Sequence, residues 1–370
     1  METGVTMNGS GNPVAIIMAG GVGTRFWPLS TNDRPKQFLT LSGDRSLLQQ
    51  SCDRISGYIP PERIMVLTQS RFTGLVAEQL PGIPTGNIIG EPLRRDTAAA
   101  ITIAAIVTQR RFGNAVMVIL TADHLIEPED AFLKAVESAV EASSRDHVLY
   151  TFGIPPTYPA TGYGYIEFGR EILDDSGIKH FELTRFREKP DEQSAQTYID
   201  SGRYLWNSGM FVWQTDVILR LLETHLPGHI SAISTAVGDD SVPLEQALAT
   251  ALEPLRAVSI DYGVMEHASP VRCIAAPFSW SDIGGWNALG ASLEEDADGN
   301  AHRCRLTALD AARNMAFCEN GDDEVILIGV DDLIVARSGS RILVAAKDRV
   351  DELKAALARD AGNDEAIPPT

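Results

Sequence analysis

The sequence predicts an α/β protein with a mixed, mainly parallel sheet covered by helices, followed by a smaller β-rich region. Short apolar runs alternate with helical patterns over the first two thirds of the 370 residues, an order typical of parallel sheets. A Gly-rich loop follows the first apolar run directly, at the strand end where such sheets bind ligands. Four closely spaced strand patterns recur near the C-terminus, which indicates a separate β-rich domain.

The first half of the chain alternates strands and helices. Each expected strand is a short apolar run, and each expected helix spaces its apolar residues at intervals of three to four. The expected strands are residues 14–18, 63–68, 115–121 and 147–152, and the expected helices are residues 71–80, 98–111 and 131–143.

The pattern changes after residue 160. Short strands bounded by Gly, Pro and charged turns are expected at 163–168, 181–186 and 210–214, and we interpret them as an inserted lobe that faces the substrate. A last core strand is expected at 272–276. After the polar break at 293–300 we expect strands at 315–318, 325–328, 333–336 and 342–346 and a closing helix at 348–358.

These patterns divide the chain into four parts. They are a disordered lead-in at 1–13, a principal α/β domain at 14–292, a β-rich domain at 293–360 and a flexible tail at 361–370.

The charge balance limits the partners of the protein. Lys and Arg number 31 and Asp and Glu number 50, a net charge of −19, which disfavours binding to nucleic acid or to an anionic membrane. Residues 1–115 hold 11 basic and 8 acidic side chains, so an anionic ligand is expected in that third. No C-x-x-C spacing, signal peptide or membrane-spanning run is present, and we therefore expect a cytoplasmic protein.

The Gly-rich loop is the sharpest motif. Its glycines, at 20, 21 and 23, let backbone N–H groups approach a phosphate. Phe26 stands where a Rossmann dinucleotide loop needs its third glycine, and no Walker A Gly-Lys-Ser/Thr follows. Arg25 and Lys36 add two cations nearby. The loop therefore predicts a cationic cradle for a polyphosphate, with a purely structural turn as the alternative; its expected nucleotide-binding residues are Gly20, Gly21, Gly23 and Thr24.

Two aspartates are candidates for metal binding. Asp123 ends the strand at 115–121, and Asp282 follows another strand within Trp280-Ser-Asp-Ile-Gly-Gly-Trp286. Mg²⁺ takes one or two carboxylates together with phosphate oxygens and water, so two strand-end acids suit it. The alternative is that each acid only caps a turn or a helix.

The run GGVGTRFWPLS, followed by RPKQFL, resembles the N-terminal motif of the sugar-phosphate nucleotidyltransferases. Its Trp-Pro and Pro-Lys-Gln-Phe details are most similar to the family members that transfer GMP to mannose 1-phosphate. The resemblance extends from about residue 14 to residue 358. It implies a Rossmann-like nucleotidyltransferase domain as the principal domain, and a small C-terminal left-handed β-helix-like domain that helps to form a homodimer. Longer relatives append a cupin-type isomerase domain, for which this chain leaves no room, so we expect no isomerase activity.

The resemblance also implies the substrates and the chemistry. GTP and α-D-mannose 1-phosphate would react with Mg²⁺ as cofactor, held by Asp123 and Asp282, with Asp123 also facing the nucleotide. No Ser, Cys or His arrangement indicates a covalent intermediate, so in-line displacement by positioning and charge neutralisation is expected. In this mechanism Arg25 holds the departing pyrophosphate and Lys36 neutralises the α-phosphate.

Two further segments are expected on the sugar-phosphate side, and the first of them resembles the family. Phe-Arg-Glu-Lys-Pro at 186–190 is similar to the family's F-V-E-K-P, with Arg187 replacing an apolar residue. There Glu188 would bind sugar hydroxyls and Lys189 the sugar phosphate. Asn207, beside a Gly turn and aromatic residues, suits hydroxyl recognition. Each segment also has a bland interpretation as a charged turn or a buried aromatic strand.

Two more positions are expected on the sugar-phosphate side. Gly164 gives close backbone approach, unless it only forms a hairpin turn. Asp261, in a segment that resembles the family, would orient the sugar or Mg²⁺, or else would only cap a helix.

Recognition of the base is expected at Gly-Glu-Pro-Leu-Arg-Arg-Asp-Thr-Ala, residues 90–98. Glu91 would accept from guanine N–H donors, and Thr97 would contribute a hydroxyl. Family members commonly carry Asn where this chain has Asp96, which leaves the hydrogen bonding there open. Three alternatives remain: a different nucleotide or hexose phosphate as substrate, a non-catalytic regulatory homologue that binds nucleotide sugars, and a dinucleotide oxidoreductase, which the absent third glycine disfavours.

Overall fold

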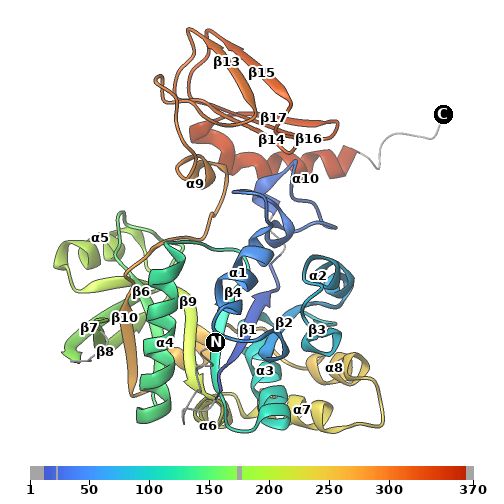
Figure 1. The fold of residues 1–370 in the computed structure, drawn as a ribbon, viewed down its shortest axis with the longest axis vertical. Helices are drawn as coiled ribbons and strands as arrows, with labels where there is room; N and C mark the ends of the chain where they lie inside the picture. The colour runs from blue at the N-terminus through green and yellow to red at the C-terminus, as the bar shows by residue number, and fades with distance from the viewer. Residues whose placement is uncertain (1–11, 22–23, 173–176, 364–370) are drawn as a thin grey trace, which may run out of the picture. The chain divides into compact units, whose positions relative to one another are not determined.

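A computed structural model describes residues 12–21, 24–172 and 177–363 of the chain (Figure 1). The lead-in expected at 1–13 and the tail expected at 361–370 lie mostly outside these residues. Contacts divide the chain into two compact units. Of the described residues, the sheet unit comprises 12–20, 49–122, 126–172 and 177–280, and the C-terminal unit comprises 21, 24–48, 123–125 and 281–363.

The sheet unit is built on one nine-stranded sheet with the order β3-β2-β1-β4-β9-β6-β10-β8-β7. Seven of the nine strands run in one direction, and β8 and β9 oppose them. This confirms the predicted mixed, mainly parallel sheet. The strands are β1 (Val14–Ala19), β2 (Ile64–Gln69), β3 (Ile88–Glu91), β4 (Val116–Thr121), β6 (Leu149–Ile154), β7 (Tyr165–Ile172), β8 (His180–Arg187), β9 (Tyr204–Gln214) and β10 (Val271–Ala275).

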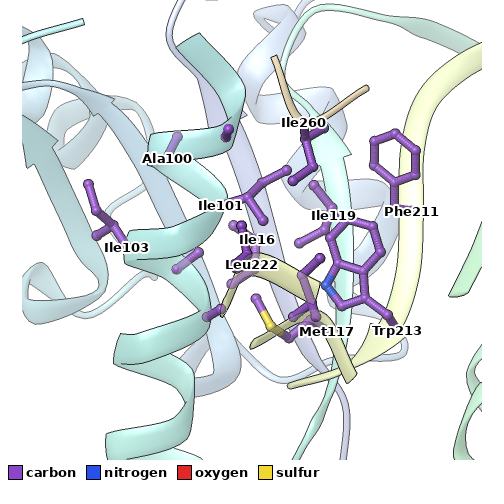
Figure 2. Close-up of a cluster of buried hydrophobic side chains, with 14 of the residues drawn as sticks. Ile16, Ala100, Ile101, Ile103, Met117, Ile119, Phe211, Trp213, Leu222 and Ile260 are labelled. Carbon is purple, nitrogen blue, oxygen red and sulfur yellow. The ribbon is translucent and has the colours of Figure 1, made fainter. Parts of the chain in front are cut away.

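Helices cover this sheet. Helix α3 carries a continuous run of buried residues from Ala98 to Thr108 and packs against β1, β2, α6 and α7. Figure 2 shows Ile16 of β1 and Met117 and Ile119 of β4 beside Ile101 of α3 in this core. The helices of the unit are α2 (Thr73–Gln79), α3 (Asp96–Phe112), α4 (Glu129–Asp146), α5 (Glu192–Ser201), α6 (Thr215–His225), α7 (Pro227–Gly238) and α8 (Leu244–Leu252), and α1 (Leu47–Ser56) enters from the C-terminal unit.

Strand β9 differs from its expectation. We expected a short strand at 210–214 in an inserted lobe, but β9 runs from Tyr204 to Gln214 in the middle of the sheet, between β4 and β6. Strands β7 and β8 extend the same sheet, so the expectation of a separate inserted lobe was wrong. Gly209, with a φ of +70°, interrupts the apolar pattern and hides the continuity of the strand in the sequence.

The C-terminal unit carries short parallel strands. The pairs β12–β14, β14–β16 and β13–β15 are all parallel and join segments 14 to 19 residues apart, which is typical of a β-helix-like coil. Short β12 and β13 were not predicted, and the closing helix is divided into η7 (Lys347–Glu352) and α10. The elements are β12 (Ala301–Arg303), β13 (Arg305–Leu309), β14 (Met315–Cys318), β15 (Glu324–Ile328), β16 (Leu333–Ser338), β17 (Arg341–Ala346), α9 (Trp286–Gly290) and α10 (Leu353–Asn363).

The Gly-rich loop region packs into the core of the C-terminal unit. The Phe26 ring meets Trp286 edge to face at 5.3 Å, and Trp286 meets Phe317 at 5.6 Å. The indole N–H of Trp286 donates to the Trp27 carbonyl at 3.1 Å. Residues of the C-terminal unit therefore fix the backbone that carries Arg25.

Two short strands, β5 (Leu125–Glu127) and β11 (Ser279–Ser281), form a small sheet of their own. Among the described residues, none of the helices combines the length and apolar character needed to cross a membrane.

Candidate active site

Four side chains expected to act in catalysis or metal binding lie together in the C-terminal unit. We call Arg25, Lys36, Asp123 and Asp282 the cation–carboxylate cluster. Lys36, at the start of η2 (Lys36–Phe38), is only 8% exposed. Its Nζ lies 3.0 Å from Asp123 Oδ2 and also donates to the backbone carbonyl of Asp282. One buried ammonium thus joins the two segments that carry the aspartates.

Arg25 reaches the same segment as Asp282. It lies in η1 (Thr24–Phe26), and its Nη1 donates to the Gly284 carbonyl at 2.8 Å. A Cβ built on Gly284 would lie 3.4 Å from Arg25 Nη1 and 3.4 Å from both carboxylate oxygens of Asp282. The guanidinium and the carboxylate therefore approach one backbone position, which favours glycine there.

Ile283 holds these two carbonyls in place. Its φ is +39°, a region that a β-branched residue rarely adopts. Its side chain is fully buried in the core of the C-terminal unit, which can compensate for the backbone strain. The Asp282 carbonyl, before Ile283, accepts from Lys36, and the Gly284 carbonyl, after Ile283, accepts from Arg25.

The electrostatics of Asp123 favour its charged form. Burial alone raises the pKa of this carboxyl, but the charges of Lys36 and His124 and the Lys36 hydrogen bond lower it more, and the net pKa lies below the usual value. His124 Nε2 stands 3.9 Å from Asp123 Oδ1. Asp123 is therefore a carboxylate at neutral pH.

The donor set fits Mg²⁺. Two carboxylates are hard oxygen ligands, and Mg²⁺ completes its shell with phosphate oxygens and water. In the described part of the chain no group of three or more His, Cys, Asp or Glu gathers as an all-protein metal site, so a metal held here needs substrate oxygens. The cap alternative for Asp282 is weakened, because the N-cap residue of α9 is Gly285.

The Gly-rich loop is only partly described, since Gly23 lies outside the described residues; Thr24 begins η1. In the C-terminal unit, Gln37 Nε2 donates to the Gly21 carbonyl at 3.1 Å. A Cβ at Gly20 or Gly21 would make only ordinary contacts, at 4.0 and 3.9 Å. Among the described residues no contact demands glycine at these two positions, and close approach of a ligand is a reason consistent with this.

On the sheet unit, Glu91 ends β3 and is buried. Burial raises its pKa to about 7, against the opposing charge of Arg94. Nearby in sequence, Thr97 Oγ1 accepts the Ile260 N–H at 2.8 Å. Asp96 has a φ of +64° and accepts the Thr97 N–H at 2.8 Å. Asp, like Asn, tolerates this backbone conformation.

A second group of predicted residues meets within the sheet unit. We call Gly164, Glu188, Lys189, Asn207 and Asp261 the acid–amide cluster. The Asn207 N–H donates to the Gly164 carbonyl at 2.8 Å, and Asn207 Nδ2 donates to Asp261 Oδ1 at 3.0 Å. Lys189 Nζ lies 3.1 Å from Glu188 Oε1. A Cβ on Gly164 would lie 2.4 Å from Glu188 Oε2, so a larger residue at this position would displace the Glu188 carboxylate.

Burial and neighbouring charges shift the pKa values of two residues in the acid–amide cluster. Burial, and then the Glu188 charge, raise the pKa of Asp261 to about 7, while Lys189 and Asn207 oppose the shift. Burial lowers the pKa of Lys189, but Glu188 outweighs it and the net pKa is raised. Asp261 is the first residue of η6 (Asp261–Met265), whose N-cap residue is Ile260, so the helix-cap alternative for Asp261 is not observed.

Two residues that support these clusters were not singled out from the sequence. Ile283 carries the strained backbone between the two carbonyls, and Thr151 donates to Asn207 Oδ1 at 2.8 Å. An Ile between Asp and Gly and a Thr inside an apolar strand look ordinary, so no sequence signal marks either one.

The model for the family described as "Nucleotidyl transferase" matches residues 14–299. The chain therefore belongs to the nucleotidyl transferase family. This confirms the resemblance drawn from the Gly-rich loop and identifies the class of the protein as an enzyme of nucleotidyl transfer.

Its relatives are more specific. The chain is 36% identical over 345 residues to a mannose-1-phosphate guanylyltransferase of Sinorhizobium fredii, covering 92% of this chain and 66% of that protein. It is 38% identical to the mannose-1-phosphate guanylyltransferase RfbM of Salmonella typhimurium, covering 92% and 70%. The chain thus spans about two thirds of these relatives. A solved structure described as a mannose-1-phosphate geranyltransferase from Thermus thermophilus matches with a TM-score of 0.82 and 32% identity, over 94% of this chain and 99% of that one.

Proposed function

We propose that this chain transfers GMP from GTP to α-D-mannose 1-phosphate, giving GDP-mannose and pyrophosphate. The observation that carries the proposal is the cation–carboxylate cluster, in which Lys36 is joined to Asp123 and to the Asp282 backbone while Arg25 bonds Gly284. Relatives described as mannose-1-phosphate guanylyltransferases, at 36–38% identity, support the choice of substrates.

The reaction is an in-line displacement. An oxygen of the sugar phosphate attacks the α-phosphorus of GTP, a new P–O bond forms, and the bond from the α-phosphorus to the oxygen bridging to the β-phosphate breaks with release of pyrophosphate. The nucleophile belongs to the substrate, so no covalent enzyme intermediate is needed. Lys36 neutralises charge on the α-phosphate, and Arg25 holds the departing pyrophosphate. Mg²⁺ held by Asp123 and Asp282 would supply further charge neutralisation and orient the phosphates.

The acid–amide cluster is assigned to the sugar phosphate. Lys189 binds its phosphate, because it is the cation of that cluster and Glu188 keeps it protonated. The oxygen and nitrogen atoms of Glu188, Asn207 and Asp261 bind hexose hydroxyls, and Gly164 leaves room for them.

The guanine base is assigned to Glu91 and the segment after it. An ionised carboxylate accepts from N1–H and N2–H₂ of guanine, two donors that adenine does not present together. The Thr97 hydroxyl accepts the Ile260 N–H, and its own hydrogen is assigned to a hydrogen bond with the base.

We also infer a homodimer. In the C-terminal unit, Leu309 on β13 pairs in register with Ile328 on β15, and both are exposed, at 58% and 64%. Ile326, Ile342 and Val344 are exposed at 57–62% as well. Apolar side chains gathered on strands mark interfaces, and a second copy of the chain suits these strands. The cytoplasm is the inferred location, since all four cysteines are free thiols.

The test is a pyrophosphate-release assay over four nucleoside triphosphates and several hexose 1-phosphates, with Mg²⁺. The proposal predicts the highest rate with GTP and mannose 1-phosphate. A higher rate with another pair would overturn the substrate assignment, and the absence of release with every pair would favour the non-catalytic homologue.

A further inference from the structure

Thr151 is a polar residue at a fully buried position of the sheet. It lies in β6, in which every residue is buried, and its own exposure is 0%. Valine has nearly the same shape, but a buried hydroxyl costs free energy unless it is hydrogen-bonded. A hydrogen bond therefore stabilises the buried Thr151 hydroxyl, and the identity of its partner indicates its role.

The partners lie on the neighbouring strand β9. Thr151 Oγ1 stands 2.8 Å from Asn207 Oδ1 and 3.1 Å from the Met210 carbonyl. The pairing of β6 with β9 shifts here, since Thr151 pairs with Phe211 whereas Gly153 pairs with Asn207. The two extra residues on β9 form a bulge, and bulges re-aim side chains next to functional sites.

The Asn207 amide has two possible orientations. Its oxygen and nitrogen ends have nearly the same shape, so a half-turn of the amide exchanges an acceptor for a donor. In the observed arrangement Oδ1 accepts from Thr151 and Nδ2 donates to Asp261 Oδ1 at 3.0 Å. The reversed amide would place its oxygen against an oxygen of Asp261, which is unfavourable when that carboxyl is ionised. The Thr151 hydroxyl has one hydrogen and two nearby acceptors; with the hydrogen directed to the nearer one, Asn207 Oδ1 at 2.8 Å rather than the Met210 carbonyl at 3.1 Å, it supports the first orientation from the opposite end.

We propose that Thr151 is a positioning residue for the sugar-phosphate site: its hydroxyl sets the orientation of the Asn207 amide and thereby the pattern of donors and acceptors offered to the hexose hydroxyls. The proposal rests on the assignment of the acid–amide cluster to the sugar phosphate. Thr151 acts through Asn207, because its own side chain is fully buried. Without the hydroxyl, Asn207 and Asp261 remain in place but the amide is no longer fixed from both ends.

The experiment compares Thr151→Val, Thr151→Ala and Thr151→Ser by steady-state kinetics. Removal of the hydroxyl in Val or Ala raises the KM for mannose 1-phosphate about tenfold, the effect of one hydrogen bond, and leaves the KM for GTP unchanged. Ser restores the KM for mannose 1-phosphate to within about twofold of wild type. The Ala variant keeps the test valid if Val does not fold. The role is overturned if both variants keep the wild-type KM, if both KM values rise together, or if Ser behaves as Ala does.

A matched control is Thr108→Val. Thr108 is a second fully buried threonine of the sheet unit, in α3, and its hydroxyl has no partner among the described residues. Both KM values stay at wild type in this variant. The variant Asn207→Ala distinguishes a failure of the sugar-site assignment from a failure of the role of Thr151. If it leaves the KM for mannose 1-phosphate unchanged, the sugar-site assignment fails. If it raises that KM and Thr151→Val does not, only the role of Thr151 fails.

Discussion

Lys36 Nζ lies 3.0 Å from Asp123 Oδ2, and the same ammonium donates to the backbone carbonyl of Asp282, 246 residues further along the chain. Asp123–Leu125 belongs to the C-terminal unit although the chain on both sides of it belongs to the sheet unit. The cation–carboxylate cluster is thus complete within one compact unit. The low pKa of Asp123 follows from this contact.

Asp282 is expected to bind the metal. Asp282→Asn keeps the shape and removes one negative charge, so the Mg²⁺ concentration for half-maximal pyrophosphate release rises about tenfold or more, and the maximal rate falls. A Mg²⁺ titration checks this, with Asp298→Asn as control, because Asp298 is an exposed aspartate of the same unit. A titration that is identical in wild type and Asp282→Asn would contradict the metal role.

The proposed direct displacement, without a covalent intermediate, has its own test. With GTP, Mg²⁺ and labelled pyrophosphate but no sugar phosphate, no label enters GTP, because the attacking oxygen comes from the sugar phosphate. Addition of GDP-mannose in place of GTP starts the reverse reaction and produces labelled GTP, which shows that the enzyme is active under these conditions. Label in GTP without any sugar substrate would require a guanylyl-enzyme.

Glu91 predicts a pH dependence of stability. Its pKa is raised from 4.5 to about 7 in the folded protein, so between these values the folded state binds more protons than the unfolded state. The free energy of unfolding therefore falls as the pH rises through this window. The side chain in Glu91→Gln does not titrate. Between pH 5 and pH 8 the free energy of unfolding of this variant therefore rises relative to that of wild type by up to roughly 3 kcal/mol. Urea unfolding at both pH values measures this, and equal changes in the two proteins would contradict the burial of an ionisable Glu91.

The inferred homodimer depends on the apolar strands of the C-terminal unit. Ile326 is 60% exposed on β15, and Ile326→Lys places a charge where a second copy would pack. Sedimentation equilibrium is expected to give a dimer for wild type and a monomer for this variant. Val242→Lys changes an exposed apolar residue of the sheet unit, 39% exposed, and is expected to remain dimeric. A monomeric wild type would overturn the inference.

Much of the fold is encoded locally. The strands β1, β2, β4, β6 and β10 are buried apolar runs, and the sequence predicts each to within a few residues. Because both faces of these strands are buried, each strand is a continuous apolar run and lacks the apolar–polar alternation of a strand with one exposed face. Only the last part of β9 was predicted, because Ser208 and Gly209 interrupt its apolar pattern. Strands β12 and β13 were missed because a short half-exposed strand has no distinctive pattern.

The candidate site depends on long-range contacts. A motif marks Arg25, Lys36, Asp123 and Asp282 one by one, but only the fold shows that Lys36 joins the two aspartate segments. Thr151 cannot be found from the sequence, because its role depends on a register shift between two strands. Sequence motifs identify groups that can touch a ligand, and the groups that orient them emerge from packing.

The central claim is that Lys36 acts on the triphosphate. The most direct measurement is the rate of pyrophosphate release from GTP and mannose 1-phosphate by wild type, Lys36→Met and Lys134→Met. Lys134 is a matched control, since its side chain is 69% exposed and pairs with Asp130 at 3.6 Å. Loss of one positioned charge is expected to lower the rate of Lys36→Met by about 10²–10³. Because Asp123 is 35% exposed and water can solvate it, the thermal midpoint stays within a few degrees of wild type. A rate for Lys36→Met within about tenfold of wild type would contradict the account.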